Sequence, residues 1–446
     1  DLFPGIELPS PDYGDLMTAI KNQLEKKNLQ EHEYFLTKVI QLYEVICVRH
    51  GLMIVGRPFS GKTTAIKVLA DALSELNEKG LMGEMKTVYS MLNPKSVHMN
   101  YLYGNFDEVS HDWSDGVLAV LYRHFANSAD HHIRKWLLFD GPVDAIWIEN
   151  MNTVHDDNKK LCLMSGEIIQ MSPNMNLIFE PMDLDVASPA TVSRCGMIFL
   201  EPELLGWQPI FQSWLNTLPE GFDEELKKGI EELIHWLIPP MLDFVRNRAL
   251  ETTPTQDQNL VRSCLRIMKG LLKIFEEDSS KFEMPKKEIM AIIDGSFLFG
   301  LIWSICSTVT TEYRKACNDC LKKLLQGDLD TGTKPLKKIS FPDRGTIYDH
   351  VFYPEENKWV NWHDLIDKNE KIPKDISPQD IIVTTTDKIK YSYLLELFIN
   401  NEIPTLYVGP TGTGKSIYIQ NVLQTTLSKE KFSTIEVGFS AQTSAS

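Results

Sequence analysis

The sequence predicts an α/β protein with a parallel sheet flanked by helices, followed by an all-helical region and the start of a second α/β unit. Apolar strand-like runs alternate with helical patterns from residue 31 to about 203. Helical spacing then dominates from 204 to about 335. The pattern GxxxxGK[ST] between a strand-like run and a helical pattern occurs twice, at 56–63 and at 409–416. Two occurrences in the same structural context make chance an unlikely origin.

Length, composition and charge limit the possible classes of protein. A chain of 446 residues is too long for one hydrophobic core, and 43% hydrophobic with 24% charged residues is typical of globular domains. The net charge of −16 repels phosphate backbones, so we expect no nucleic-acid partner. The longest apolar run, 297–309, is shorter than a membrane span. We interpret it as a buried helix and expect no membrane partner.

The chain begins with a proline-containing lead and two amphipathic helices. Apolar residues recur every three or four positions in both helical patterns: Leu16, Ile20 and Leu24, then Phe35, Val39, Leu42 and Ile46. The second pattern leads into a strand at 51–55. We assign residues 1–30 to a lead-in segment and residues 31–203 to the first α/β domain.

The first glycine-rich loop predicts binding of ATP or ADP with Mg²⁺. In this motif, backbone N–H groups of the loop and the helix N-terminus surround the phosphates, the lysine reaches the β and γ oxygens, and the hydroxyl meets Mg²⁺. Lys62 and Thr63 hold the lysine and hydroxyl positions. The residues that we expect to contact the nucleotide are Gly56, Ser60, Gly61, Lys62, Thr63 and Thr64, together with Asp140 and Glu180 from later strand ends.

The apolar strand 135–139 is followed by Asp140. In P-loop enzymes such a carboxylate positions Mg²⁺, usually through water, and the next residue is often the glutamate that activates the attacking water. Here the next residue is Gly141, so the metal-binding half of the motif is present and the base is missing. We therefore expect nucleotide binding without appreciable hydrolysis. Glu149, farther along the chain, is the alternative base.

Further strands and hairpins complete the first domain. Turn-forming residues between apolar or aromatic runs predict two hairpins, at 101–116 and 161–169. Strands are expected at 87–90, 176–180 and 196–200, and helices at 118–125 and 188–194. Glu180 stands at the end of one strand, and Arg194 precedes another.

The helical region, 204–335, consists of apolar stripes that we interpret as packing surfaces without chemistry. The stripe from Phe222 to Leu237 is expected to end at Pro239-Pro240, because proline breaks a helix interior. Two more stripes, 260–275 and 289–325, follow it. A linker at 327–346 closes the region.

The α/β pattern restarts in the last part of the chain, which we assign as 336–446. Its expected elements are a small β unit at 352–360, an edge strand at 381–383, a helix at 391–399, and strands at 405–408 and 434–437. The second glycine-rich loop contributes a second set of expected nucleotide contacts, with Ser416 also on Mg²⁺: Gly409, Thr411, Gly412, Thr413, Gly414, Lys415, Ser416 and Ile417. No acidic strand follows it, so hydrolysis there stays open, and we expect the chain to be part of a larger protein.

An α/β P-loop domain followed by a helical lid is the AAA+ layout, and several stretches are more specific. They resemble the second AAA+ module of a dynein heavy chain, and the tail from Tyr348 resembles the third module. The stretches are 102–116, 139–144, 147–152, 156–158 and 190–196. Residues 141–152 are more similar to axonemal than to cytoplasmic dyneins.

The resemblance implies a ring of six unequal AAA+ modules in one chain that moves along microtubules by hydrolysing ATP at its first module. The second module is thought to hold ATP without turnover, and the third to be a regulatory ATPase. The implied partners are the other modules and the mechanical linker, which the two hairpins would face, microtubules through a downstream stalk that is absent here, and dynein intermediate and light chains. The implied location is the cytoskeleton of the cytoplasm and of the axoneme in a cilium or flagellum.

The same resemblance implies roles for two further residues. Arg194 stands where AAA+ modules place an arginine finger that acts on the nucleotide of a neighbouring module, and the alternative is a surface arginine that closes a helix. Glu180 stands where a polar sensor, often asparagine, is usual, and this departure argues against γ-phosphate sensing. The rival classes are a freestanding AAA+ protein remodeller, which predicts a complete base after Asp140, and a nucleotide-free AAA+ scaffold, which intact Lys62 and Lys415 disfavour.

Overall fold

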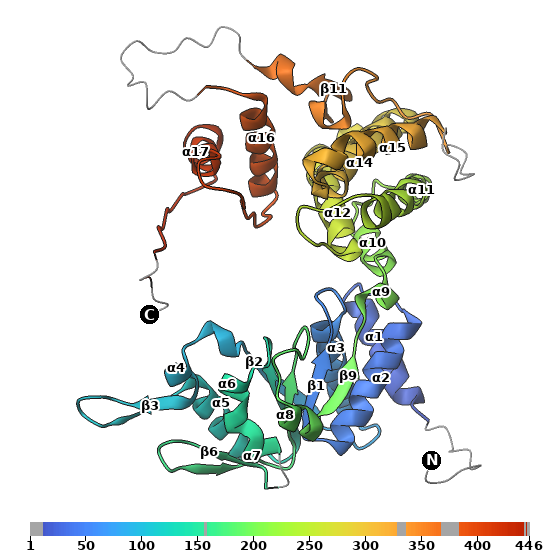
Figure 1. Ribbon diagram of the computed structural model, residues 1–446. Coiled ribbons are helices and arrows are strands. Elements are labelled where there is room, and N and C mark those ends of the chain that lie inside the picture. The colour runs from blue at the N-terminus through green and yellow to red at the C-terminus, as the bar shows by residue number, and fades with distance from the viewer. Residues whose placement is uncertain (1–11, 156–157, 328–335, 367–382, 441–442, 444–446) are drawn as a thin grey trace. The chain divides into compact units, whose positions relative to one another are not determined.

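The computed structural model describes residues 12–155, 158–327, 336–366, 383–440 and 443 (Figure 1). Its contacts divide the chain into two compact units, one reaching Pro209 and the other running from Ile210 to Thr443. Each unit has its own packing and is described by itself.

A five-stranded parallel sheet forms the centre of the first unit, with the strand order β2-β5-β8-β1-β9. The strands are β1 (Gly51–Val55), β2 (Lys86–Leu92), β5 (Ile133–Phe139), β8 (Met175–Phe179) and β9 (Gly196–Phe199). Parallel neighbours need crossover connections, which place helices on both faces. Every residue of β1 and β8 is buried. The predicted parallel α/β sheet is confirmed.

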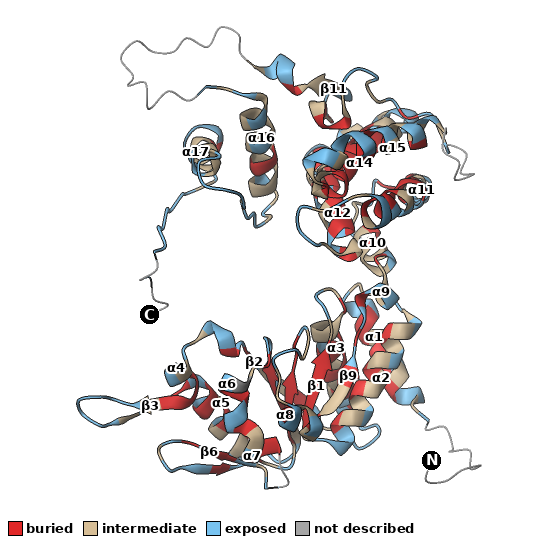
Figure 2. Cartoon of the chain, in the orientation of Figure 1, coloured by how far each residue is buried: buried red, intermediate tan, exposed pale blue. Residues whose placement is uncertain are grey.

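Apolar residues of the strands divide between two hydrophobic clusters, one on each face of the sheet. Figure 2 shows the central strands of this sheet buried. Leu52 and Ile54 face α1 (Gly14–Lys26), α2 (Glu33–Val48) and α3 (Lys62–Glu78). Met53 and Val55 belong to the opposite cluster, which includes α5 (Val117–Ala126). The apolar positions predicted for the first two helices are all buried there.

Both predicted hairpins are present in the first unit. One pairs β3 (Gly104–Phe106) with β4 (Trp113–Asp115), and the other pairs β6 (Lys160–Cys162) with β7 (Ile168–Gln170). The first hairpin is shorter than predicted, because residues 99–103 form a helix. Short helices fill the remaining connections: η1 (Pro94–Ser96), α4 (Met99–Tyr103), α6 (Ala145–Ile148), η2 (Glu149–Met151), α7 (Asn152–His155), α8 (Pro189–Arg194) and α9 (Pro202–Leu205).

The second unit begins as an all-helical bundle, as predicted. Its helices up to residue 326 are α10 (Gln208–Leu215), α11 (Glu224–Arg248), α12 (Asp257–Leu272), α13 (Ile274–Glu277), η3 (Ser279–Glu283), α14 (Lys286–Ser304), η4 (Cys306–Thr308), η5 (Thr311–Tyr313) and α15 (Arg314–Gln326). Gly300 lets α14 approach α12 closely, since a Cβ there would lie 2.9 Å from the carbonyl oxygen of Cys264.

The predicted end of a helix at Pro239-Pro240 is wrong, because α11 continues through both prolines to Arg248. Two prolines remove two backbone donors, and each proline in a helix interior costs about 3 kcal/mol. Beyond the prolines, Met241 and Val245 are buried to within 1% of full burial. Tertiary packing of this apolar face therefore outweighs the local preference to stop.

The long apolar helix of the second unit is its core. By length and composition, Lys286–Thr308 is apolar enough to cross a membrane, and its segment is longer than the 297–309 run seen in the sequence. However, 83% of its most apolar window is buried inside the folded chain. It is a buried helix, as predicted.

The last part of the second unit contains a small hairpin and several helices. These elements are η6 (Ile347–Asp349), β10 (His350–Tyr353), β11 (Lys358–Asn361), η7 (Trp362–Leu365), α16 (Thr386–Asn400), α17 (Lys415–Asn421) and the π-helix η8 (Val422–Thr426). The predicted β unit and the helix before the second loop are confirmed. Most of the edge strand expected at 381–383 lies outside the described residues, and Val383 is not in a strand.

The strands predicted on either side of the second loop are not formed. Residues 405–408 and 434–437 are coil, with Leu406 and Ile435 each 86% exposed. A parallel strand is normally covered on both faces and paired along its edges. Neither segment has a paired strand among the residues that the structure describes. The apolar composition indicated a strand, but its pairing depends on other segments.

Candidate nucleotide-binding sites

The first glycine-rich loop connects β1 to the N-terminus of α3. Gly61 precedes the helix with φ +88°, the left-handed region that favours glycine. Gly56 lies so close to the chain after β9 that a Cβ would come within 2.1 Å of the carbonyl oxygen of Leu200. Ser60 is 2% exposed, and its hydroxyl has no hydrogen-bond partner among the described residues. The loop thus presents a helix N-terminus and a buried, unsatisfied hydroxyl, which suits an anionic ligand.

The side chain of Lys62 folds back over its own loop. Its Nζ donates to the carbonyl oxygens of Gly56 and Arg57, the latter at 3.3 Å. Burial lowers the pKa of Lys62, while the nearby carboxylates of Glu180 and Asp140 act in the opposite direction. A positive group thus lies at the mouth of the loop, held by carbonyl oxygens that a phosphate oxygen would replace.

Two acidic residues follow neighbouring strands at the same edge of the sheet. The register pairs Phe139 of β5 with Phe179 of β8, so Asp140 and Glu180 come next to each other. Thr63 donates its hydroxyl to Oε2 of Glu180 at 2.5 Å. The structure therefore gathers the predicted Thr63, Asp140 and Glu180 near Lys62.

The two carboxylates differ in environment. Asp140 is exposed, whereas Glu180 is 3% exposed and its Oε1 has no partner among the described residues. Burial raises the pKa of Glu180; the hydrogen bond from Thr63 lowers it, and the Asp140 charge adds to the increase. Carboxylate and hydroxyl oxygens are the ligands that Mg²⁺ prefers. The residues present thus fit a magnesium–phosphate group.

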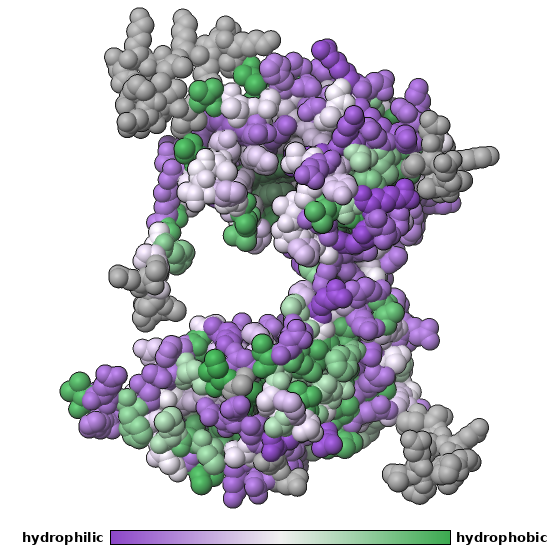
Figure 3. Space-filling model, in the orientation of Figure 1, coloured by the Kyte–Doolittle hydropathy of each residue, from purple (hydrophilic) through white to green (hydrophobic). Residues whose placement is uncertain are grey.

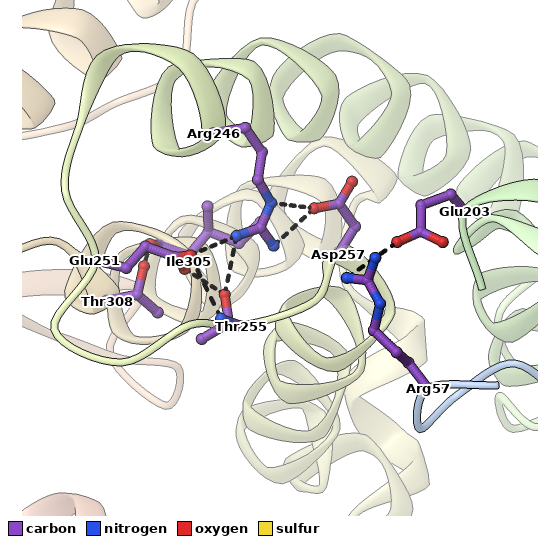
Figure 4. Close-up of polar contacts among 8 residues, drawn as sticks. All are labelled: Arg57, Glu203, Arg246, Glu251, Thr255, Asp257, Ile305 and Thr308. Carbon is purple, nitrogen blue, oxygen red and sulfur yellow. Dashed lines mark hydrogen bonds and ion pairs between the residues drawn. The ribbon is translucent and has the colours of Figure 1, made fainter. Parts of the chain in front are cut away.

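The segment that follows β9 closes one side of the loop. Figure 4 shows Arg57 of the loop and Glu203 of α9 pointing toward one another, and their side chains form an ion pair at 3.5 Å. The hydroxyl of Tyr34, on α2, accepts from the backbone N–H of Glu201 at 2.8 Å. A Cβ at Gly61 would contact the ring of Phe35 at 3.3 Å. Residues from α2 and α9 therefore border the loop.

Asn93 lies at the site but was not predicted from the sequence. It follows β2, and its Oδ1 accepts from the N–H of Lys95 at 2.9 Å. A Cβ at Gly141 would lie 2.9 Å from that Oδ1, so Asn93 lies beside the position where a base is missing. The sequence offers only a weak signal for Asn93, because β2 has the mixed sequence KTVYSML and was predicted to end at residue 90.

Arg194 and Glu149 lie on short helices of the same unit. Arg194 ends α8 and is half-buried, and its Nη1 donates to the carbonyl oxygen of Ala190 at 3.1 Å, along its own helix. Glu149 begins η2 and is exposed.

The second loop repeats the geometry of the first loop in more exposed surroundings. Gly412 and Gly414 have φ of +83° and +81°, and Gly414 precedes α17. Lys415 Nζ donates to the carbonyl oxygens of Gly409 at 2.7 Å and Pro410 at 2.5 Å. The remaining predicted contacts Thr411, Thr413, Ser416 and Ile417 are exposed. In both loops, therefore, the lysine donates to carbonyl oxygens of its own loop.

Three family models of the dynein motor match the chain. They are the hydrolytic ATP binding site of the dynein motor region at 1–63, the dynein heavy chain AAA lid domain at 230–364, and the P-loop containing dynein motor region at 370–446. Over the whole chain, the identity is 45% to axonemal heavy chain 12 of Rattus norvegicus, 44% to axonemal heavy chain 3 of Homo sapiens and 40% to axonemal heavy chain 1 of Homo sapiens. The chain belongs to the dynein heavy chain family.

This dynein chain comes from the AAA+ motor region, and it spans 15%, 11% and 11% of the lengths of those three relatives. Nucleotide binding follows from the P-loop domains that define this region. One matching model describes a hydrolytic ATP binding site, but its match ends at Thr63. It therefore does not include β5 or the Asp140-Gly141 pair, on which hydrolysis at the first loop depends.

Proposed function

We propose that this segment of an axonemal dynein heavy chain holds MgATP at its first loop without appreciable hydrolysis. The observation that carries the proposal is the cluster at the edge of the sheet, where Lys62, Thr63 and Asp140 are present and Gly141 follows. Lysine, hydroxyl and metal-positioning carboxylate are the parts that bind a magnesium nucleotide. The carboxylate that would orient a water molecule is absent.

Each residue has a stated task in this proposal. Lys62 neutralises phosphate charge, Thr63 holds Mg²⁺ directly, and Asp140 holds it through water. Bound Mg²⁺ would supply charge neutralisation between phosphate oxygens. Backbone groups of Gly56, Ser60, Gly61 and Thr64 surround the phosphates, and Glu180 borders them.

The module assignment is part of the same proposal. We assign residues 31–203 to the second dynein module after a lead-in of 1–30, 204–335 to its lid, and 336–446 to the start of the third module. The dynein lid model reaches residue 364, and the compact units divide after residue 209. Because both positions differ from the proposed boundaries, limited proteolysis is the test of where the domains end. The second loop is proposed to be a regulatory ATP site, with Lys415 on phosphate and Ser416 on Mg²⁺.

The role in the whole motor is inferred from the relatives, whose names place them in axonemes. We propose that the heavy chain acts in the axoneme of a cilium or flagellum. It would contact microtubules through a stalk outside this chain and associate with intermediate and light chains. Arg194 would serve as the arginine finger of the preceding module.

Equilibrium binding of ATP to the purified chain tests nucleotide binding, because the two loops can be inactivated separately. Lys62→Ala and Lys415→Ala are matched variants, since both lysines bond to their own loop in the same way. We expect each single variant to lose one site and the double variant to lose both. Undiminished binding by Lys62→Ala in the Lys415→Ala background would contradict the proposal.

A further inference from the structure

We propose that Glu180 makes nucleotide binding at the first loop conditional on a divalent cation. This inference rests on the proposed function, since it concerns how the same site selects magnesium-bound over metal-free nucleotide. It assigns to Glu180 a positioning role toward the metal, different from a sensor that donates to the γ-phosphate.

A hydrogen bond joins Thr63, the expected metal ligand, to Glu180. The Thr63 hydroxyl donates its only proton to Oε2 of Glu180 at 2.5 Å. A hydroxyl has one proton and two lone pairs, so this bond fixes the proton and leaves the lone pairs available to a cation. Partners in this position orient a metal ligand and raise its basicity.

The other carboxylate oxygen of Glu180, Oε1, supports the same inference. Glu180 is 3% exposed, and Oε1 is buried without a partner among the described residues. A buried, unsatisfied carboxylate oxygen is unfavourable, so its presence at the edge of a binding loop indicates a missing positive or hydrogen-donating partner. Thr63, the Mg²⁺ hydroxyl of this motif, occupies the other oxygen and directs the carboxylate toward the metal position.

The balance of charge decides the direction of the effect. Three charged residues act on the Glu180 carboxyl: Asp140, which is negative, and Lys62 and Lys67, which are positive. Metal-free ATP would add further negative charge beside a buried carboxylate, which is repulsive at low dielectric. A divalent cation between phosphate and carboxylate would change this repulsion into attraction. An asparagine at this position would lack this repulsion and offers an N–H donor to phosphate.

The test compares the affinity for ATP in excess Mg²⁺ with the affinity in EDTA, in the Lys415→Ala background so that only the first loop reports. For Glu180→Gln we expect weaker binding in Mg²⁺ and tighter binding in EDTA. The ratio of the dissociation constant in EDTA to that in Mg²⁺ should fall at least about tenfold. This is the range found for residues that support metal ligands. Glu108→Gln, at an exposed carboxylate of the same unit outside the site, should keep the ratio of the parent chain.

Binding of Mn²⁺ to the ATP-loaded chain, followed by electron paramagnetic resonance, gives a second readout that does not depend on catalysis. Weaker Mn²⁺ binding in Glu180→Gln supports the inference. If Glu180→Gln does not fold, Glu180→Asn is measured in the same way. An unchanged ratio and unchanged Mn²⁺ affinity overturn the inference while leaving the proposed function intact. Absence of ATP binding by the parent chain in both conditions overturns the proposed function instead.

Discussion

Single residues at the ends of strands determine the chemistry of the first loop. Asp140 and Glu180 follow neighbouring strands of the sheet, yet Asp140 is exposed and Glu180 is buried against Thr63. Gly141 removes the base, and Asn93 occupies the adjacent space. The side chains proposed to bind phosphate and metal are therefore present at the first loop, and the carboxylate that would activate water is missing.

A second residue, Glu75 on α3, controls how α1 is held to the sheet domain. It is 8% exposed and accepts from two amides and two lysines: Asn22 at 2.8 Å, Gln23 at 2.5 Å, Lys26 at 3.1 Å and Lys79 at 2.7 Å. Burial by itself would raise the pKa of Glu75, but hydrogen bonds from these four residues lower it to about 2. The ionised carboxylate thus stabilises the contact between α1 and α3.

We predict that Glu75→Gln lowers the free energy of unfolding of the first unit by about 2 kcal/mol at pH 7. Because the folded pKa is depressed from 4.5 to about 2, this stabilisation is complete above the unfolded pKa and is lost as pH falls toward 2. Urea unfolding of the parent and variant chains at several pH values measures the difference. A difference that stays constant from pH 7 to pH 3 would refute the assignment. Glu78→Gln on the same helix serves as the control.

At the level of elements, one arginine connects the two hairpins. Arg123 on α5 donates to Asp115 of β4 at 2.8 and 3.0 Å, and through Nε to Glu167, just before β7, at 2.9 Å. The hairpins also carry exposed apolar side chains, with Val109 91% and Met164 83% exposed, and Figure 3 shows hydrophobic atoms at the tip of the β3–β4 hairpin. Arg123 thus holds two projecting elements in a fixed relation.

We predict that Arg123→Gln loosens both hairpins together. A partly exposed bidentate pair contributes about 1 kcal/mol, so amide hydrogen exchange in both hairpins should accelerate about fivefold while the sheet stays protected. The control is His124→Gln, an exposed neighbour on the same helix. Faster exchange in only one hairpin, or in neither, would show that Arg123 does not connect them.

The sequence predicted elements where the signal is local and missed what depends on distant partners. The apolar strands of the first unit are local patterns, and they were confirmed. Pro239-Pro240 suggested a helix end because the packing that sustains α11 is not visible in the sequence. Residues 405–408 have the composition of a strand but no paired strand in the described chain. The contact of Arg123 with Glu167 joins residues 44 positions apart, which no periodicity reveals.

For the candidate site, the phosphate-loop residues could be predicted because the motif fixes their spacing, and Asp140 could be predicted because it directly follows an apolar strand. The bond between Thr63 and Glu180 could not, since it joins residues 117 positions apart and depends on strand order. The strand order β2-β5-β8-β1-β9 also places Asn93 beside Gly141. Knowledge of the sheet topology is therefore what turns separate strand ends into one site.

At the scale of the whole molecule, the two loops have different surroundings. The first loop belongs to a complete five-stranded sheet, whereas the second is exposed and has no paired strand beside it in the described part of the chain. The proposed motor function therefore gives them different roles: the first site holds nucleotide and the second regulates. The catalytic contribution of the module that contains the first loop would come from Arg194, acting on the preceding module.

We predict that Arg194→Ala in the full-length heavy chain lowers microtubule-stimulated ATPase activity by about 10³-fold or more, as expected for loss of an arginine finger. Nucleotide occupancy at Lys62 should not change, because Arg194 acts on another module. Steady-state ATPase assays with a parallel measurement of bound nucleotide test both parts. Normal turnover in the variant would indicate that Arg194 only closes α8.

The fate of ATP bound at the first loop is the most direct test of the proposal that this site binds ATP without hydrolysing it. Radiolabelled ATP is bound to the Lys415→Ala chain in Mg²⁺, and the bound nucleotide and released phosphate are followed over time. We predict that the nucleotide is recovered as ATP, with phosphate release no faster than in the Lys62→Ala, Lys415→Ala double variant. Recovery as ADP, with phosphate release that Lys62→Ala abolishes, would contradict it.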